Sequence, residues 1–394
     1  MTLRVAIVGC GKIADTHVAE IQKLDGAARV VAVVDREILM AEQLAVRFGV
    51  PCFMDDLDQM LDRARPEVVH VATPPGSHLA IARRCLEAGA HVFVEKPLTP
   101  TYEETRELVA LAFCARKKLT TGHGYAFDPP ALALAELLRR GDLGDPVHLE
   151  SFYGYDLENP FGTALLGDRS HWVHDLPGKL FQNNVDHLLA KIVGLLGEEG
   201  ADPLAGLRID ATGFRRRTRL FGDARDDLLD ELRVGIVGPK LSANAVFTSH
   251  VQPVQHFAKI YGTLGTAQVD YEKRTVTLEA RPRVPSALGR LSPAFDQGLA
   301  FLREGMRNVA SFARADFHYF AGLSRLLRLF YESIETDGPP PIPYRDLLRG
   351  AALADEIFRQ VPQGKPKIHL APRPEARPKH DRNEGRPHPQ ELFV

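Results

Sequence analysis

Residues 5–21 read VAIVGCGKIADTHVAEI, an apolar run that passes through a glycine-rich turn into a helical pattern. Gly9, Gly11 and Ala14 stand in the spacing GxGxxA. In a strand–turn–helix unit, the first glycine permits the tight turn and the second lets the backbone approach a pyrophosphate, while the small third residue lets helix and strand pack. This stretch therefore predicts a fold that binds a dinucleotide.

A helix is expected over Ala14–Leu24, directly after the turn. The backbone amides at its amino terminus, near Lys12 and Ile13, have no partner within the helix and are free to bind phosphates. Asp35 ends the next apolar run, at the distance where a carboxylate accepts hydrogen bonds from the adenosine ribose. That carboxylate would repel a 2'-phosphate, so the sequence favours NAD over NADP. Arg36 leaves NADP open, because a guanidinium can stack on adenine or reach a phosphate.

Apolar runs alternate with helical patterns throughout residues 1–122, which predicts a parallel sheet covered by helices, as in a Rossmann domain. From residue 123 the strand candidates become alternating and are joined by turn signals, which favours antiparallel pairing. Amphipathic helices are expected around 292–309, 318–336 and 344–361. We therefore predict an α/β protein whose second, α+β domain spans residues 123–370.

Composition excludes several classes of protein. The chain has 394 residues, a formal net charge of -2 and four cysteines without a CxxC motif. Neither a nucleic-acid footprint, nor a disulfide framework, nor a membrane segment is expected. A cytoplasmic location is the corresponding expectation. Residues 371–394 are rich in proline and charge, which predicts disorder.

Residues 68–101 read VVHVATPPGSHLAIARRCLEAGAHVFVEKPLTPT, with further motifs at 122–130 (GHGYAFDPP), 260–271 (IYGTLGTAQVDY) and 330–344 (FYESIETDGPPPIPY). These stretches closely resemble the glucose-fructose oxidoreductase / inositol dehydrogenase / rhizopine catabolism (Gfo/Idh/MocA) family. The resemblance covers nearly the whole chain except the tail. It implies a second domain with a large open, mostly antiparallel sheet that mediates homo-oligomers, either dimers or tetramers, and a sugar-like substrate.

The resemblance also implies roles for residues at the ends of the parallel strands. Lys96 matches the lysine of the family's EKP motif, which contacts substrate and nicotinamide; an ammonium there stabilises negative charge developing on oxygen. Glu95 would hold Lys96 and the cofactor ribose, and Thr73 and Pro74 would line the nicotinamide ribose site. His78 matches a family histidine, although a hydrogen bonder at a helix N-terminus is an equally good interpretation.

The family's second signature is a helix that carries an aspartate and, four residues later, a histidine. Here residues 176–197 (LPGKLFQNNVDHLLAKIVGLLG) place Asn183 and His187 at that spacing, on one helix face. His187 is the candidate general base; a satisfied histidine on a partly buried helix is the alternative. Asn183 departs from the family, because an amide cannot replace the carboxylate but can hydrogen-bond a hydroxyl. A one-residue shift would bring Asp186 into play instead.

Substrate contacts are expected around Trp172, the only tryptophan, whose indole suits stacking on a pyranose or cyclitol ring. His174 beside it can bond hydroxyls. By the resemblance, His123 and Tyr125 face the same cleft, with a core or hinge aromatic as the alternative for Tyr125. The histidines in this region match no standard zinc spacing, so no metal is expected.

These residues predict an NAD-dependent oxidoreductase that transfers hydride between nicotinamide and a secondary alcohol or ketone of a sugar, cyclitol or sugar derivative. Asn183 keeps open a redox-neutral reaction on tightly bound NAD, such as epimerisation, elimination or glycoside cleavage. A catalytically silent NAD-binding regulatory protein is the third hypothesis, against which Lys96 and His187 argue.

Overall fold

The computed structural model describes most of the chain. The described residues are 2–24, 26–157, 162, 168, 170–197, 202–216, 228–280, 292–314, 317–318, 320–362 and 368–369. The tail predicted to be disordered, residues 371–394, lies outside the described residues. None of the helices within the described ranges is long and apolar enough to cross a membrane.

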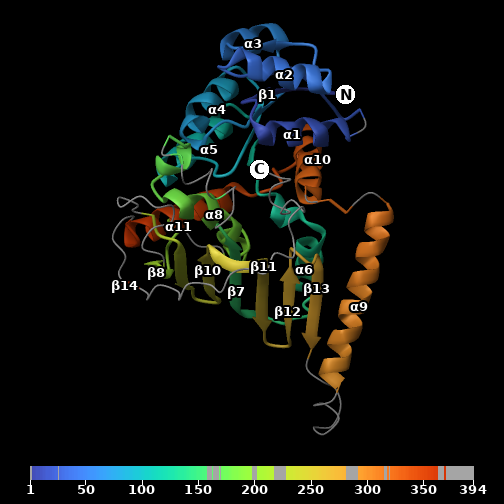
Figure 1. Cartoon of the computed structure of the whole chain (residues 1–394), viewed down its shortest axis with the longest axis vertical. Helices are drawn as coiled ribbons and strands as arrows, with labels where there is room; N and C mark the ends of the chain where they lie inside the picture. Colours follow the sequence, from blue (N-terminus) through green and yellow to red (C-terminus); the bar gives the residue numbers. More distant parts are fainter. Residues whose placement is uncertain are drawn as a thin grey trace, which may run out of the picture.

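The first domain is built on a six-stranded parallel sheet with the strand order β3-β2-β1-β4-β5-β6 (Figure 1). The strands are β1 (Leu3–Val8), β2 (Ala28–Val34), β3 (Phe53–Met54), β4 (Val68–Val71), β5 (His91–Val94) and β6 (Leu119–Thr121). The helices that connect them are α1 (Lys12–Gln22), α2 (Ile38–Phe48), α3 (Leu57–Ala64), α4 (His78–Glu87) and α5 (Tyr102–Cys114), with the 3-10 turn η1 (Pro75–Ser77). The strand order reverses between β1 and β4, and ligands bind such sheets at the carboxyl ends of the strands beside this point. The Rossmann prediction is confirmed.

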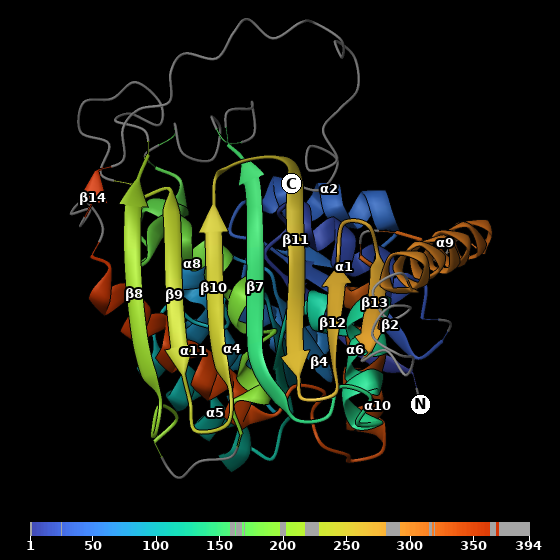
Figure 2. The same ribbon diagram turned by 90° about the horizontal axis from the view of Figure 1, so that it is seen from below.

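The second sheet has eight strands in the order β13-β12-β11-β7-β10-β9-β8-β14 (Figure 2). Their bounds are β7 (Pro146–Asp156), β8 (Arg208–Arg215), β9 (Glu231–Val237), β10 (Ser242–Thr248), β11 (His250–Gly262), β12 (Gly265–Asp270), β13 (Thr275–Ala280) and β14 (Ile368–His369). The β10–β7 and β14–β8 pairs are parallel and the other pairs are antiparallel. The predicted large, mostly antiparallel sheet is therefore confirmed.

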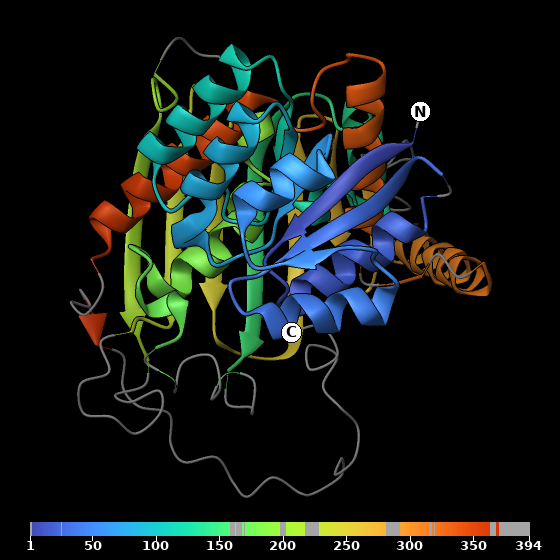
Figure 3. The same cartoon turned by 90° about the horizontal axis from the view of Figure 1, so that it is seen from above.

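Helices lie on one face of this second sheet, between it and the first domain (Figure 3). They are α6 (Pro129–Arg139), α8 (Lys179–Leu189) and α11 (Tyr344–Gln360), with the 3-10 turns η2 (Gly124–Phe127), η3 (Trp172–His174) and η4 (Val193–Leu195). Helix α9 (Ser292–Ala313) stands beside β13 at the sheet edge and has no buried residue. The three helices predicted near the end of the chain are confirmed as α9, α10 (Ala321–Glu335) and α11.

Helix α10 packs into the core of the first domain, although it lies far beyond residue 122. Leu326, Leu327 and Phe330 are fully buried in the same apolar cluster as Phe93 of β5. The sheet of the first domain is thus covered in part by a late segment of the chain. The domain boundary at residue 122 therefore stays a prediction. In the structure, α10 from the second region packs into the core of the first.

Gly9 occupies a position that only glycine fits without strain. Its φ is +92°, and a Cβ added there would lie 2.8 Å from the carbonyl carbon of Ala72. We expect Gly9→Ala to lower the free energy of unfolding by more than about 2 kcal/mol, because backbone strain and overlap act together. Gly49→Ala is the control: φ there is +67° and nothing lies within 4 Å, so only the strain remains. If thermal unfolding showed the same loss of stability in both variants, the predicted overlap of a Cβ at residue 9 with Ala72 would be contradicted.

Candidate active site

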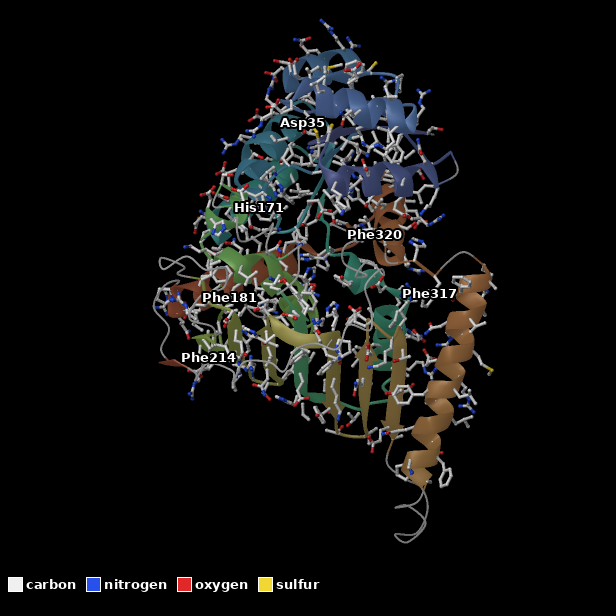
Figure 4. The ribbon with its side chains drawn as sticks, viewed as in Figure 1. Asp35, His171, Phe181, Phe214, Phe317 and Phe320 are labelled. Atoms are coloured by element: carbon white, nitrogen blue, oxygen red, sulfur yellow. The ribbon has the colours of Figure 1, made fainter. Side chains whose placement is uncertain are left out.

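A cleft of about 720 Å³ opens at the carboxyl ends of the parallel strands, between the two domains. Figure 4 labels Asp35 in the upper domain and His171 and Phe320 nearer the boundary with the second sheet. Predicted site residues from both domains line this cleft: Gly11, Lys12, Ile13, Thr73, Pro74, Glu95, Lys96, Tyr125, Trp172, Asn183 and His187. The structure therefore brings most of the predicted cofactor and substrate residues to one place.

The phosphate loop has the form that a dinucleotide requires. Gly11 is the N-cap of α1 without a side-chain cap, so the first amides of the helix have no capping partner. A Cβ at Gly11 would meet nothing within 4 Å, which leaves open space directly above the backbone. Asp35 Oδ2 accepts a hydrogen bond from the Cys10 amide at 2.7 Å and so ties the loop to the end of β2. These residues fit the pyrophosphate and adenosine half of NAD.

Replacing Asp35 should change the choice of cofactor. Asp35→Asn keeps the size of the side chain and an oxygen for the Cys10 amide, but it removes the charge that would bind ribose hydroxyls and repel a 2'-phosphate. We expect the Kd for NADH to rise about 10- to 100-fold and the NADPH/NADH preference to shift toward NADPH. Fluorescence titration with both cofactors checks this. Asp55→Asn, at an exposed position just after β3, serves as the control. An unchanged cofactor preference in Asp35→Asn would contradict the assignment of Asp35 to the adenosine ribose.

Lys96 joins the two halves of the cleft. Its Nζ lies 3.2 Å from Asn183 Oδ1 and 3.3 Å from the Asn183 carbonyl oxygen, so the end of β5 is held against α8. Burial lowers the pKa of Lys96, and the carboxylates of Glu95 and Asp186 offset this only in part. A partly desolvated ammonium of this kind is a strong hydrogen-bond donor to an oxygen that gains negative charge. The Lys96–Pro97 peptide bond is cis.

Glu95 lies directly behind Lys96 at the edge of the cleft. Its Oε2 accepts a hydrogen bond from the Lys96 amide at 3.1 Å, and its Oε1 lies 2.8 Å from His17 Nε2. Burial is the largest single influence and raises the pKa of Glu95, but the interactions with His17 and Lys96 together outweigh it, so the pKa lies below its usual value. The carboxylate is therefore ionised at neutral pH and fixed through both oxygens.

His187 shares one face of α8 with Asn183, as the spacing predicts. Its ring meets Tyr125 edge to face at 5.0 Å and Tyr153 at 5.2 Å between ring centroids. Burial, followed by the nearby charges of Lys96 and Lys191, holds the pKa of His187 well below 6.5. The imidazole is consequently neutral at pH 7, which is the form that accepts a proton.

Asp186 does not take the place of Asn183. Its Oδ2 lies 3.6 Å from His123 Nε2, and both residues line a smaller neighbouring cavity beside α11 rather than the cleft. The one-residue shift considered from the sequence is therefore not what the structure shows. His123, predicted as a substrate contact, lies outside the cleft for the same reason.

Two other predicted contacts also lie away from the cleft lining. His78 is fully buried, with Nε2 2.7 Å from the Thr73 carbonyl oxygen and Nδ1 3.0 Å from that of Pro97. It therefore connects the segments that carry Pro74 and Lys96 instead of facing a ligand. His174 is on η3 next to Trp172 but does not line the cleft. No group of three or more possible metal ligands occurs in the described part of the chain.

Sequence reasoning missed several residues of the cleft. Tyr153 and Tyr155 stand two apart on β7 and both point inward, a placement that the alternation in FYGYD could have indicated. Tyr155 donates to Asn184 Oδ1 at 3.0 Å. Asp128 also lines the cleft, and burial raises its pKa to about 7 despite Arg274 and the Gly322 amide. The motif around Asp128 reads only as a helix start, so its exposure to the cleft had no sequence signal.

Comparison with known proteins agrees with this geometry. Residues 3–123 match the Gfo/Idh/MocA model described as an oxidoreductase family with an NAD-binding Rossmann fold. The first domain is therefore similar to the NAD-binding domain of the Gfo/Idh/MocA oxidoreductases. The prediction of an NAD-binding domain is thereby confirmed.

The similar sequences are dehydrogenases matched over part of their length. Inositol 2-dehydrogenase 1 of Saccharopolyspora erythraea is 35% identical over 174 residues, 42% of this chain and 51% of that protein. D-glucoside 3-dehydrogenase of Escherichia coli is 35% identical over 143 residues, 36% of this chain and 41% of that protein. The matched segment thus spans about half or less of these relatives.

Solved structures share the fold over nearly the whole chain. Levoglucosan dehydrogenase in complex with NADH superposes with a TM-score of 0.74 at 16% identity, covering 91% of this chain and 97% of that one. The WlbA dehydrogenase of Bordetella pertussis, solved with NADH and UDP-GlcNAcA, gives 0.69 at 18% identity, with 91% and 95% coverage. This chain therefore shares the overall fold of those structures.

Proposed function

We propose that this protein is an NAD-dependent oxidoreductase that transfers hydride between nicotinamide and a secondary alcohol or ketone of a sugar, cyclitol or sugar derivative. The contact between Lys96 Nζ and Asn183 Oδ1, with His187 on the same helix face, is the observation that carries the proposal. This arrangement supports Lys96 as the donor to the reacting oxygen and His187 as the neutral base beside it.

NAD, when bound, supplies or accepts the hydride, and the protein's residues do the rest. In the oxidative direction Lys96 donates a hydrogen bond to the substrate oxygen, while neutral His187 takes the hydroxyl proton. Tyr125 packs against His187 and limits water around it. Trp172 lines the cleft with an indole face suited to a sugar ring, and Asn183 offers an amide to a hydroxyl. The substrate class is supported by the dehydrogenases that resemble this chain in part.

A redox-neutral reaction is the second candidate, because the side chain that contacts Lys96 is the amide of Asn183 rather than a carboxylate. Assays on the purified protein distinguish the two reactions. NADH formation with a panel of sugars, cyclitols and nucleotide sugars supports the dehydrogenase. Substrate consumption with retained cofactor and no net NADH supports the redox-neutral enzyme, whereas neither binding nor consumption supports a regulatory protein.

The proposed enzyme is a homo-oligomer that assembles through the open face of its second sheet. Phe152 and Phe257 stack at 5.2 Å and are only partly buried. Because side chains alternate along a strand, they lie on the face opposite to their buried neighbours Tyr153 and His256. Apolar surface of this kind is typical of a subunit contact. Light scattering of the purified protein measures the subunit number. The cysteines Cys10, Cys52, Cys85 and Cys114 are free, in keeping with a reducing, cytoplasmic setting.

A further inference from the structure

Four polar side chains form a continuous buried chain that starts in α10 and ends at the cleft. Tyr331 Oη lies 2.9 Å from His70 Nε2, and His70 Nδ1 lies 2.9 Å from His17 Nδ1. His17 Nε2 lies 2.8 Å from Glu95 Oε1. The side chains of His17 and His70 are fully buried, and Tyr331 is 1% exposed. The members come from α10, β4, α1 and the end of β5, so the chain links four segments that are far apart in the sequence.

Glu95 sets the direction of the hydrogen bonds at one end of the chain. The ionised Glu95 carboxylate can only accept, so His17 carries a proton on Nε2 and donates it there. With that single ring proton, His17 accepts at Nδ1, which requires a proton on Nδ1 of His70. His70 consequently accepts at Nε2, from the Tyr331 hydroxyl. Each ring nitrogen and the hydroxyl thus takes part in one hydrogen bond of the chain. Burial holds the pKa of His70 well below 6.5, in keeping with a neutral ring.

The surroundings leave these groups little freedom. Phe93 stacks on His70 at 4.8 Å and meets the His17 ring edge to face at 5.3 Å. Gly122 closes the other side of Glu95, because a Cβ at that position would lie 2.7 Å from Glu95 Oε1. The carboxylate thus has one available orientation, with its second oxygen on the Lys96 amide.

We propose that His17, His70 and Tyr331 are positioning residues for Lys96, acting as a one-way hydrogen-bond chain that holds Glu95 and thereby the Lys96 backbone at the cleft. This inference rests on the proposed function of Lys96. Burying three neutral polar side chains where apolar ones would pack adds little stability by itself. Their connection to a cleft residue gives them a role that apolar residues could not fill.

Kinetics of matched variants test the proposal. We expect His17→Leu to lower kcat about 10- to 100-fold, because a loosened support displaces the reacting group, with the Kd for NADH changed less than about threefold. His17→Gln keeps an N–H donor and should recover most of the loss, and Tyr331→Phe should have a smaller effect than His17→Leu. Cys85→Ala, a buried change in the same domain outside the chain, controls for lost stability. Equal kcat in His17→Leu and wild type, or no recovery in His17→Gln, would overturn the proposal.

A second measurement needs no substrate. Nitrogen NMR of histidine-labelled protein at pH 7 should show His17 as the Nε2–H tautomer and His70 as the Nδ1–H tautomer, with both signals assigned from the His17→Gln and His70→Gln spectra. The opposite tautomers, or an imidazolium at either position, would overturn the chain whatever the kinetics. Correct tautomers in a protein that turns over no sugar or cyclitol would count against the proposed function and not against the chain.

Discussion

Lys96→Ala should lower kcat about 100- to 1000-fold, the loss expected when a single donor to a developing oxyanion is removed. The Kd for NADH should change less than about threefold, because the pyrophosphate loop at Gly11 and Lys12 lies elsewhere in the cleft and Asp35 is bonded to the Cys10 amide of that loop. Steady-state kinetics on a substrate found in the panel, together with NADH fluorescence titration, measure both quantities.

The control for this variant is Lys240→Ala, which removes an exposed lysine in the turn between β9 and β10. It should leave kcat and the Kd for NADH unchanged. Comparable losses of cofactor affinity and turnover in Lys96→Ala would instead identify Lys96 as a cofactor ligand. A rise in KM with kcat unchanged would exclude Lys96 from the chemical step.

His187→Asn should lower kcat about 100- to 10,000-fold, since it removes the general base while keeping a polar side chain on α8. The pH dependence gives a second signature. The folded-state pKa of His187 lies well below 6.5, so the neutral, active form persists as the pH falls through 6.5 and is lost only at lower pH. The acid limb of kcat/KM in the wild-type protein should therefore lie below pH 6.5.

The acid limb of the kcat/KM profile should disappear in His187→Asn. It should move to higher pH in Lys96→Ala, because the Lys96 charge is one cause of the lowered His187 pKa. His148→Asn, a histidine bonded to Ser242 on the second sheet away from the cleft, is the matched control and should retain the wild-type profile. An acid limb at or above pH 6.5, or one that survives in His187→Asn, would assign the base to another residue.

Much of this molecule could be predicted from local patterns. The GxGxxA turn and the apolar strands specify the first sheet, because each signal involves neighbours in sequence. The i, i+4 spacing of Asn183 and His187 likewise follows from helix geometry alone. Contacts between residues that are distant in the sequence were harder to predict. His123 was expected in the cleft, yet it faces Asp186 in a separate cavity.

Most of the residues that sequence reasoning overlooked share one property. Asp128 and Tyr331 acquire their surroundings from segments distant in the chain, so no local motif indicates them. Tyr153 is the exception, since the alternation in FYGYD could have indicated that it points inward. His17 lies inside the opening motif itself, but its partners His70 and Glu95 are 53 and 78 residues away. Its hydrogen bonds became visible only once the strands were placed side by side.

Helix α10 also bears on how the protein is made. Residues 1–122 leave the ribosome long before Leu326, Phe330 and Tyr331 exist, so the nascent first sheet exposes the apolar surface around Phe93 that these residues later cover. Completion of the dinucleotide domain must wait until almost the entire chain has been synthesised. A fragment that ends at residue 122 would leave that surface bare, and we expect it to be less stable than the same fragment mixed with a peptide of α10.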